Sequence, residues 1–140
     1  MSEAVKEVPK KVRREYRNIH VVNLGNYRQP PSAIVSILHR ISGAGLFIML
    51  PFLMYLLQLS LRSEESFMQF KGVLEHVPVK ILLLIISWGY LHHFCAGIRH
   101  LFMDNHFALD KEGAGVTARI VLGLSLLLTV LVGLKLFGVF

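Results

Sequence analysis

The chain has 140 residues, of which 54% are hydrophobic and 17% charged, with a formal net charge of +6 at pH 7. The apolar residues stand in three long blocks instead of recurring with a helical or strand period, which excludes an ordinary soluble domain. The single cysteine, Cys95, excludes an intramolecular disulfide and is expected to be a small buried residue.

The first 30 residues are polar and basic and have no apolar core, so we do not expect a cleavable secretory signal there. Glu3, Glu7 and Glu15 argue against an organellar transit peptide. A basic run can bind nucleic acid, but ahead of a membrane span it is typical of a cytoplasmic anchor. We therefore predict a cytoplasmic basic segment over residues 1–30 and no nucleic-acid binding. Its basic residues are Lys6, Lys10, Lys11, Arg13, Arg14, Arg17 and Arg28.

Each apolar block is long enough to cross a bilayer, which takes roughly 20 residues. The blocks contain no Asp or Glu, which argues against a small proton-coupled transporter. The fold class we predict is all-α: an integral membrane bundle of three transmembrane helices over residues 31–140, with spans at about 33–61, 78–103 and 117–140. The positive-inside rule places the amino terminus in the cytoplasm, so the inner ends of the first two spans meet on one side of the membrane.

The inner end of the first span carries Ser36, His39 and Arg40, which share one helical face because they are spaced i, i+3 and i+4. Such a donor cluster can polarise a carbonyl of a lipid-soluble ligand, and a quinone is the obvious candidate. The alternative is an interfacial anchor in which Arg40 pairs with lipid phosphate. The residues by themselves favour neither interpretation. Pro51, further along the span, predicts a kink.

The connection between the first two spans predicts a short helix at the membrane interface. Ser63 is a suitable N-cap, and apolar residues follow it at helical spacing. Pro78 suits the first turn of the second span, where its missing N–H matters least. The apolar positions are Phe67, Phe70, Val73, Leu74 and Val77.

The second span continues into a stretch with several histidines. His93 and His100 are seven residues apart and share a face with Gly97, and His93 lies roughly 10 Å deeper in the bilayer. This pattern fits a heme b whose iron is bound by His93 and whose propionates face Arg99 and His100. The alternative is that His93 only hydrogen-bonds a carbonyl or a serine of another helix. His92 points roughly 100° away, and we expect it to pack or to hydrogen-bond.

A six-coordinate heme needs a second axial ligand on its other face. His92 and His100 stand on the same helix as His93 and cannot reach around the iron. His39 is expected at the level of His100 and not of His93. The sequence therefore implies that a second ligand comes from a partner subunit.

Two motifs resemble those of a known family. "SAIVSILHRISG" (32–43) and "HFCAGIRHLFMD" (93–104), on the first and second of three spans, are similar to the large cytochrome b subunit of succinate dehydrogenase, respiratory complex II. The resemblance implies that His93 is the heme-iron ligand and that Ser36 and Arg40 bind ubiquinone. It places His39 and His100 near the heme propionates, where Arg40 and Arg99 also supply charge.

The same resemblance implies three partner subunits. A small membrane-anchor subunit supplies the other heme ligand, and an iron–sulfur subunit and a flavoprotein dock on the cytoplasmic face. Succinate is oxidised at the flavin, and electrons reach the quinone through iron–sulfur clusters. The expected location is a bacterial inner membrane rather than a mitochondrial one. A heme-free structural anchor and the anchor of a quinol–fumarate reductase are the alternatives.

Overall fold

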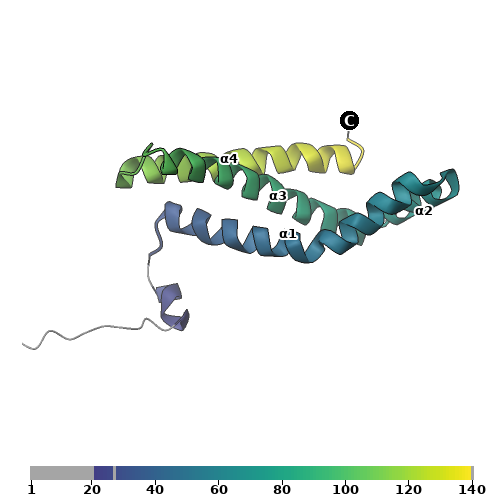
Figure 1. Ribbon diagram of the computed structural model, residues 1–140, viewed down its shortest axis with the longest axis horizontal. Helices are drawn as coiled ribbons and strands as arrows, with labels where there is room; N and C mark the ends of the chain where they lie inside the picture. Colours follow the sequence, from purple (N-terminus) through teal and green to yellow (C-terminus); the bar gives the residue numbers. More distant parts are fainter. Residues whose placement is uncertain (1–20, 27, 140) are drawn as a thin grey trace, which may run out of the picture.

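A computed structural model describes residues 21–26 and 28–139, so most of the basic segment expected over 1–30 lies outside the described residues. The described residues form helices and no strands (Figure 1). Three of these helices are long and apolar enough to cross a membrane, which confirms the all-α fold of three spans. The elements are the 3₁₀ helix η1 (Val21–Asn26) and the helices α1 (Pro31–Arg62), α2 (Glu64–Glu75), α3 (Val77–Asp104) and α4 (Lys111–Leu136).

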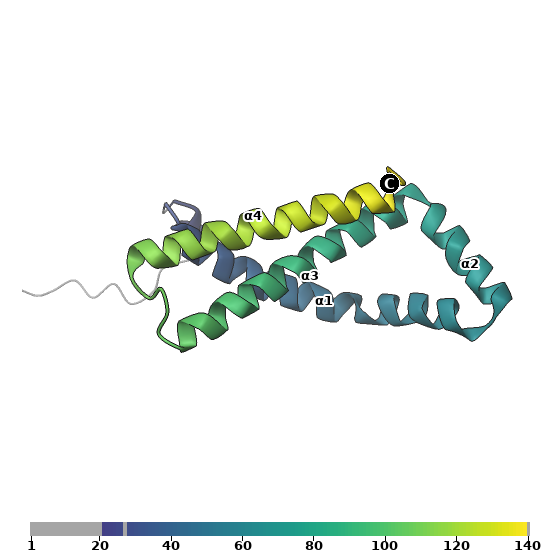
Figure 2. The same ribbon diagram turned by 90° about the horizontal axis from the view of Figure 1, so that it is seen from above.

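The three long helices pack together, with α3 crossing α1 (Figure 2), and α2 joins the far ends of α1 and α3 (Figures 1 and 2). The start of α1, the end of α3 and the start of α4 gather at one end, which we call the amino end of the bundle. Helix α2 and the end of α4 lie at the opposite end. The polar clusters of the first two spans are therefore brought to the same end, as predicted.

Local sequence signals set the helix boundaries. Helix α1 begins with Pro31 and runs through Pro51, and its second half departs from the line of its first half (Figure 1). Helix α2 has a capping box, because Ser63 Oγ accepts from the Ser66 N–H at 3.2 Å and Ser66 Oγ accepts from the Ser63 N–H at 2.9 Å. The predicted Ser63 cap is thus confirmed. Helix α4 begins where the Asp110 carboxylate accepts from the Gly113 N–H at 2.8 Å.

The core is narrow and built from small residues contributed by all three long helices. Small side chains let helix backbones approach closely, which is how membrane helices commonly pack. Large apolar side chains face outward instead, as Phe47 and Ile48 do at 77% and 67% exposure, and this arrangement suits a lipid environment. Cys95 is buried and free, as expected. The core residues are Val35, Cys95, Ala96, Ala118 and Val121.

Candidate functional site

Three histidines meet at the amino end of the bundle, where α1 crosses α3. The rings of His39 and His93 stack with centroids 4.1 Å apart and planes 12° apart. His39 also contacts His100, at 5.1 Å between centroids and an interplanar angle of 47°. We call His39, His93 and His100 the histidine cluster.

The expectation that His39 lies level with His100 but not with His93 is wrong. His39 stands eight residues from Pro31, while His93 and His100 stand eleven and four residues from Asp104. Because both boundaries lie at the amino end of the bundle, His39 falls between the two α3 histidines and touches both. Its ring meets the face of the His93 ring, so the two side chains do not direct nitrogens at a common point between them.

His93 is held through one nitrogen. Its Nδ1 lies 3.0 Å from the carbonyl oxygen of His39 and 3.4 Å from Ser42 Oγ. Ser42 Oγ itself donates to the same carbonyl at 3.0 Å. Because a carbonyl only accepts, Nδ1 carries the proton, and the lone pair of the neutral imidazole is then on Nε2. Histidines that bind metals are oriented in this way, with the other ring N–H donated to a carbonyl or carboxylate.

The close approach of His93 to α1 requires a glycine at position 43. A Cβ on Gly43 would stand 2.8 Å from Cε1 and 3.2 Å from Nδ1 of the His93 ring. Gly97 has a looser role, since a Cβ there would lie 3.7 Å from His39 Nε2. Ser42 and Gly43 were not predicted as site residues from the sequence. The available signal was a pair of small residues one turn after His39, at i+3 and i+4.

A groove of about 360 Å³ lies between α1 and α3 and begins beside the histidine cluster at Ser42. Gly45 and Gly89 form part of its wall, and a Cβ on either would meet nothing within 4 Å. The remaining lining is apolar, and Ile48 and Ile85 at its rim are 67% and 59% exposed. The groove is therefore an open apolar surface next to His93.

His92 stands about 100° around α3 from His93 and is fully buried. Its ring packs against Trp88 with centroids 5.5 Å apart. Neither ring nitrogen of His92 has a hydrogen-bond partner. The Val35 backbone lies nearby, but it does not form a hydrogen bond of ordinary geometry with the ring. Of the two roles expected for His92, packing is confirmed and hydrogen bonding is not found.

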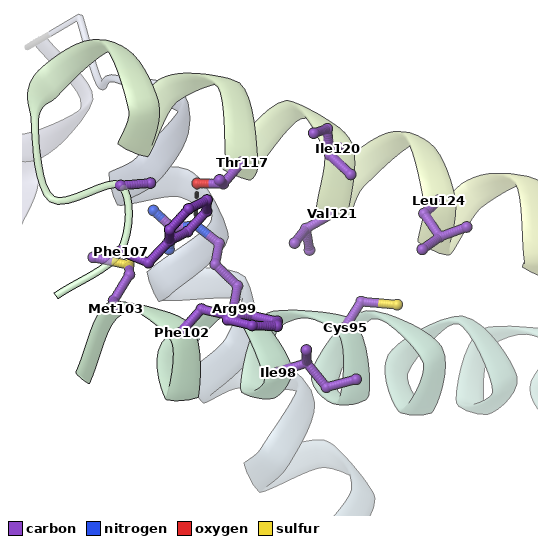
Figure 3. A pocket seen from close by; sticks show the side chains of 11 residues that line it. Cys95, Ile98, Arg99, Phe102, Met103, Phe107, Thr117, Ile120, Val121 and Leu124 are labelled. Carbon is purple, nitrogen blue, oxygen red and sulfur yellow. Dashed lines mark hydrogen bonds between the residues drawn. The ribbon is translucent and has the colours of Figure 1, made fainter. Parts of the chain in front are cut away.

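Arg99 does not join the histidine cluster. Its guanidinium reaches α4, where Nε donates to Thr117 Oγ1 at 3.0 Å and a terminal nitrogen donates to the Ala114 carbonyl at 3.2 Å (Figure 3). Arg99 is only 5% exposed and lines a different groove, between α3 and α4. The pairing of Arg99 with a heme propionate stays a prediction, and two of the five Arg99 donors serve α4 instead.

Ser36 and Arg40 lie on the same helix as His39, but His39 turns toward α3. Ser36 is half-buried and Arg40 is exposed. Within residues 28–139, neither the Ser36 hydroxyl nor the Arg40 guanidinium has a hydrogen-bond partner. Both groups are thus available to a ligand or to lipid at the amino end of the bundle.

Comparison with known proteins gives one consistent family. The sequence model of the succinate dehydrogenase/fumarate reductase transmembrane subunit matches residues 14–132, a stretch that contains both motifs and most of the third span. The chain belongs to this family.

Individual relatives agree with the family match. The succinate dehydrogenase cytochrome b556 subunit of Coxiella burnetii is 38% identical over 113 residues, covering 80% of this chain and 90% of the relative. The subunit of that name from Rickettsia felis is 34% identical over 109 residues, covering 78% and 85%. That of Paracoccus denitrificans is 32% identical over 105 residues, covering 75% and 81%. This family member is therefore a membrane-anchor subunit of the succinate dehydrogenase cytochrome b type, as the two motifs predicted.

Proposed function

We propose that this chain binds heme b and that His93 is one axial ligand of its iron. The observation that supports the proposal is the fixed tautomer of His93: Nδ1–H donates to the His39 carbonyl, so Nε2 is left as a ligand. The alternative role of His93, a hydrogen bond to another helix, is present as well but uses only one of the two nitrogens. The relatives carry the name cytochrome b556, which agrees with this proposal.

The surroundings of His93 fit a flat apolar macrocycle. The groove beside Ser42 is apolar, and Gly45 and Gly89 add no side chain to its wall. Arg40 and the two other cluster histidines lie toward the amino end of the bundle, where they would hold propionates by charge and hydrogen bonds. Arg99 is omitted from this set because its guanidinium reaches α4 and not the histidine cluster. When bound, heme b supplies one-electron transfer.

The second axial ligand is proposed to come from a small membrane-anchor subunit. His39 meets His93 face to face, His92 is fully buried and His100 shares a helix with His93, so none of them can bind the iron opposite His93. The exposed apolar rim of the groove, at Ile48 and Ile85, suits a covering transmembrane helix. An iron–sulfur subunit and a flavoprotein would dock at the amino end of the bundle, on the cytoplasmic face of a bacterial inner membrane, together with segment 1–30.

Ser36 and Arg40 are proposed to bind the ubiquinone that accepts electrons derived from succinate. Their hydroxyl and guanidinium have no hydrogen-bond partner within residues 28–139 and stand one turn apart at the amino end of the bundle. A hydroxyl and a guanidinium are both donors, and a quinone carbonyl accepts. Lipid anchoring needs the charge of Arg40 alone, whereas a quinone also needs the Ser36 hydroxyl.

The quinone proposal is tested with Ser36→Ala and Arg40→Lys. Ser36→Ala removes a hydrogen bond worth on the order of 1 kcal/mol, which corresponds to roughly a fivefold weaker interaction with quinone. Arg40→Lys keeps the charge but loses the planar fork. We expect both variants to oxidise succinate normally with an artificial acceptor and to reduce quinone more slowly.

The matched controls are Ser60→Ala and Arg62→Lys, at the opposite end of the same helix. They should leave both activities unchanged. If Ser36→Ala and Arg40→Lys reduce quinone at the wild-type rate, the two residues act only as a lipid anchor. Separately, a purified complex with no b-type band in its reduced-minus-oxidised spectrum would favour the heme-free structural anchor.

A further inference from the structure

A second groove, distinct from the histidine cluster, lies between the last turns of α3 and the first turns of α4 (Figure 3). Its volume is about 290 Å³, and its lining is apolar except at Arg99 and Thr117. The groove is not used by the proposed heme or quinone sites. We call it the α3/α4 groove.

Arg99 brings an uncompensated charge to this groove. A guanidinium stays protonated in proteins, and burying a charge without a counter-ion is costly, above all at membrane depth. Arg99 is 5% exposed, yet its hydrogen bonds go to two neutral groups, the Thr117 hydroxyl and the Ala114 carbonyl. No Asp or Glu among the described residues pairs with it. Of its five N–H donors, three remain for another ligand.

The distribution of polarity along the groove indicates the form of that ligand. Arg99 stands five residues from Asp104, close to the amino end of the bundle. From there the groove continues deeper into the span, past Cys95 on α3 and Val121 and Leu124 on α4. Phe102 and Phe107 border it near the surface. A ligand that fits has one anionic group at the membrane interface and an apolar remainder along the membrane normal.

We propose that the α3/α4 groove binds one anionic phospholipid, whose phosphate pairs with Arg99 and whose acyl chain lies along the groove. A guanidinium and a phosphate form paired, charge-assisted hydrogen bonds. A zwitterionic lipid offers the same phosphate but carries its own cation, so it leaves the charge of Arg99 uncompensated. The site therefore selects for net negative charge. This inference does not depend on the heme or quinone proposals.

The test uses the complex that contains the full chain, purified and placed in nanodiscs of phosphatidylcholine and phosphatidylglycerol in equal parts. Native mass spectrometry then counts the lipids that stay bound. We expect one retained phosphatidylglycerol per chain, with roughly a tenfold preference over phosphatidylcholine, in line with a charge-assisted contact. Arg99→Gln should abolish the preference, and Arg99→Lys should retain much of it.

A second variant covers the case in which Arg99→Gln does not assemble. Leu124→Trp fills the deep part of the groove without touching Arg99 and should expel the lipid. Its control, Leu131→Trp, lies two turns further along α4 at 47% exposure, close to the 44% of Leu124, and does not line the groove. Equal lipid retention in Leu124→Trp and Leu131→Trp would overturn the proposal. Equal retention of both lipids by the wild type would overturn it as well. Loss of a membrane subunit from the Leu124→Trp complex would also overturn it, because the groove would then be a protein interface.

Discussion

Gly43→Ala adds one methyl group at the closest approach of α1 and α3. The new Cβ would stand 2.8 Å from Cε1 of the His93 ring, whereas carbon atoms in good contact are about 3.5–4.0 Å apart. The ring therefore has to retreat from α1 by roughly 0.7 Å or more. Helix α1 also carries the His39 carbonyl, so the 3.0 Å bond to Nδ1 lengthens beyond hydrogen-bonding distance.

The cost follows from three contributions. Overpacking costs about 1–3 kcal/mol and the lost hydrogen bond about 1 kcal/mol, while Ala in place of Gly returns up to about 1 kcal/mol of helix propensity. We expect a net destabilisation of the complex by about 1–3 kcal/mol. Its main structural effect is a changed orientation of the His93 ring.

The assay records the reduced-minus-oxidised spectrum of the purified complex and then follows the same band during heating. Gly43→Ala should show less b-type absorbance, or a shifted band, and an earlier loss on heating. Gly123→Ala is the control, because a Cβ there meets nothing within 4 Å. A Gly43→Ala complex that matches wild type in band height, band position and thermal loss would refute the assigned contact between Gly43 and His93.

Two further substitutions test hydrogen bonds that stabilise the helices outside the histidine cluster. Thr117→Val leaves Arg99 Nε without its acceptor and should lower the stability of the purified complex by about 1–3 kcal/mol, measured as a lower Tm. The control is Thr129→Val, which should change Tm little because the Thr129 hydroxyl bonds only within its own helix. Equal effects of the two variants on Tm would contradict the role given to Thr117. Ser63→Ala removes the capping box and should destabilise α2 by about 1 kcal/mol. We expect faster amide hydrogen exchange in α2 and nowhere else. Unchanged exchange in α2 would show that the helix does not need the cap.

The extent of two of the three long helices was predictable, because hydropathy and capping residues act locally. The expected spans at about 33–61 and 78–103 correspond to α1 (Pro31–Arg62) and α3 (Val77–Asp104). The third span was placed at 117–140, but α4 runs from Lys111 to Leu136. The first turn of α4 is polar and contains glycine, so a hydropathy pattern does not predict it. It forms because the Asp110 side chain caps the helix.

Only those features of the site that follow from helical periodicity could be predicted from the sequence. Spacing placed His93, His100 and Gly97 on one face of α3, and contacts with α1 agree. The polar residues of α3 stand on more than one face, so their spacing did not show which of them turns toward α4. For that reason the turn of Arg99 toward Thr117 was missed. The fit of Gly43 against His93 was missed as well, because it depends on the helix crossing.

The most direct measurement of the central claim compares two neighbouring histidines under the same substitution. His93→Leu removes the proposed axial ligand, whereas His92→Leu replaces a buried ring whose nitrogens make no hydrogen bonds, a change that should be nearly neutral. Both complexes are purified, and their reduced-minus-oxidised spectra are recorded. We predict that His92→Leu keeps the b-type band and that His93→Leu loses it or retains it partly with an altered spin state. An unchanged b-type spectrum in His93→Leu would contradict the assignment of His93 as the heme ligand.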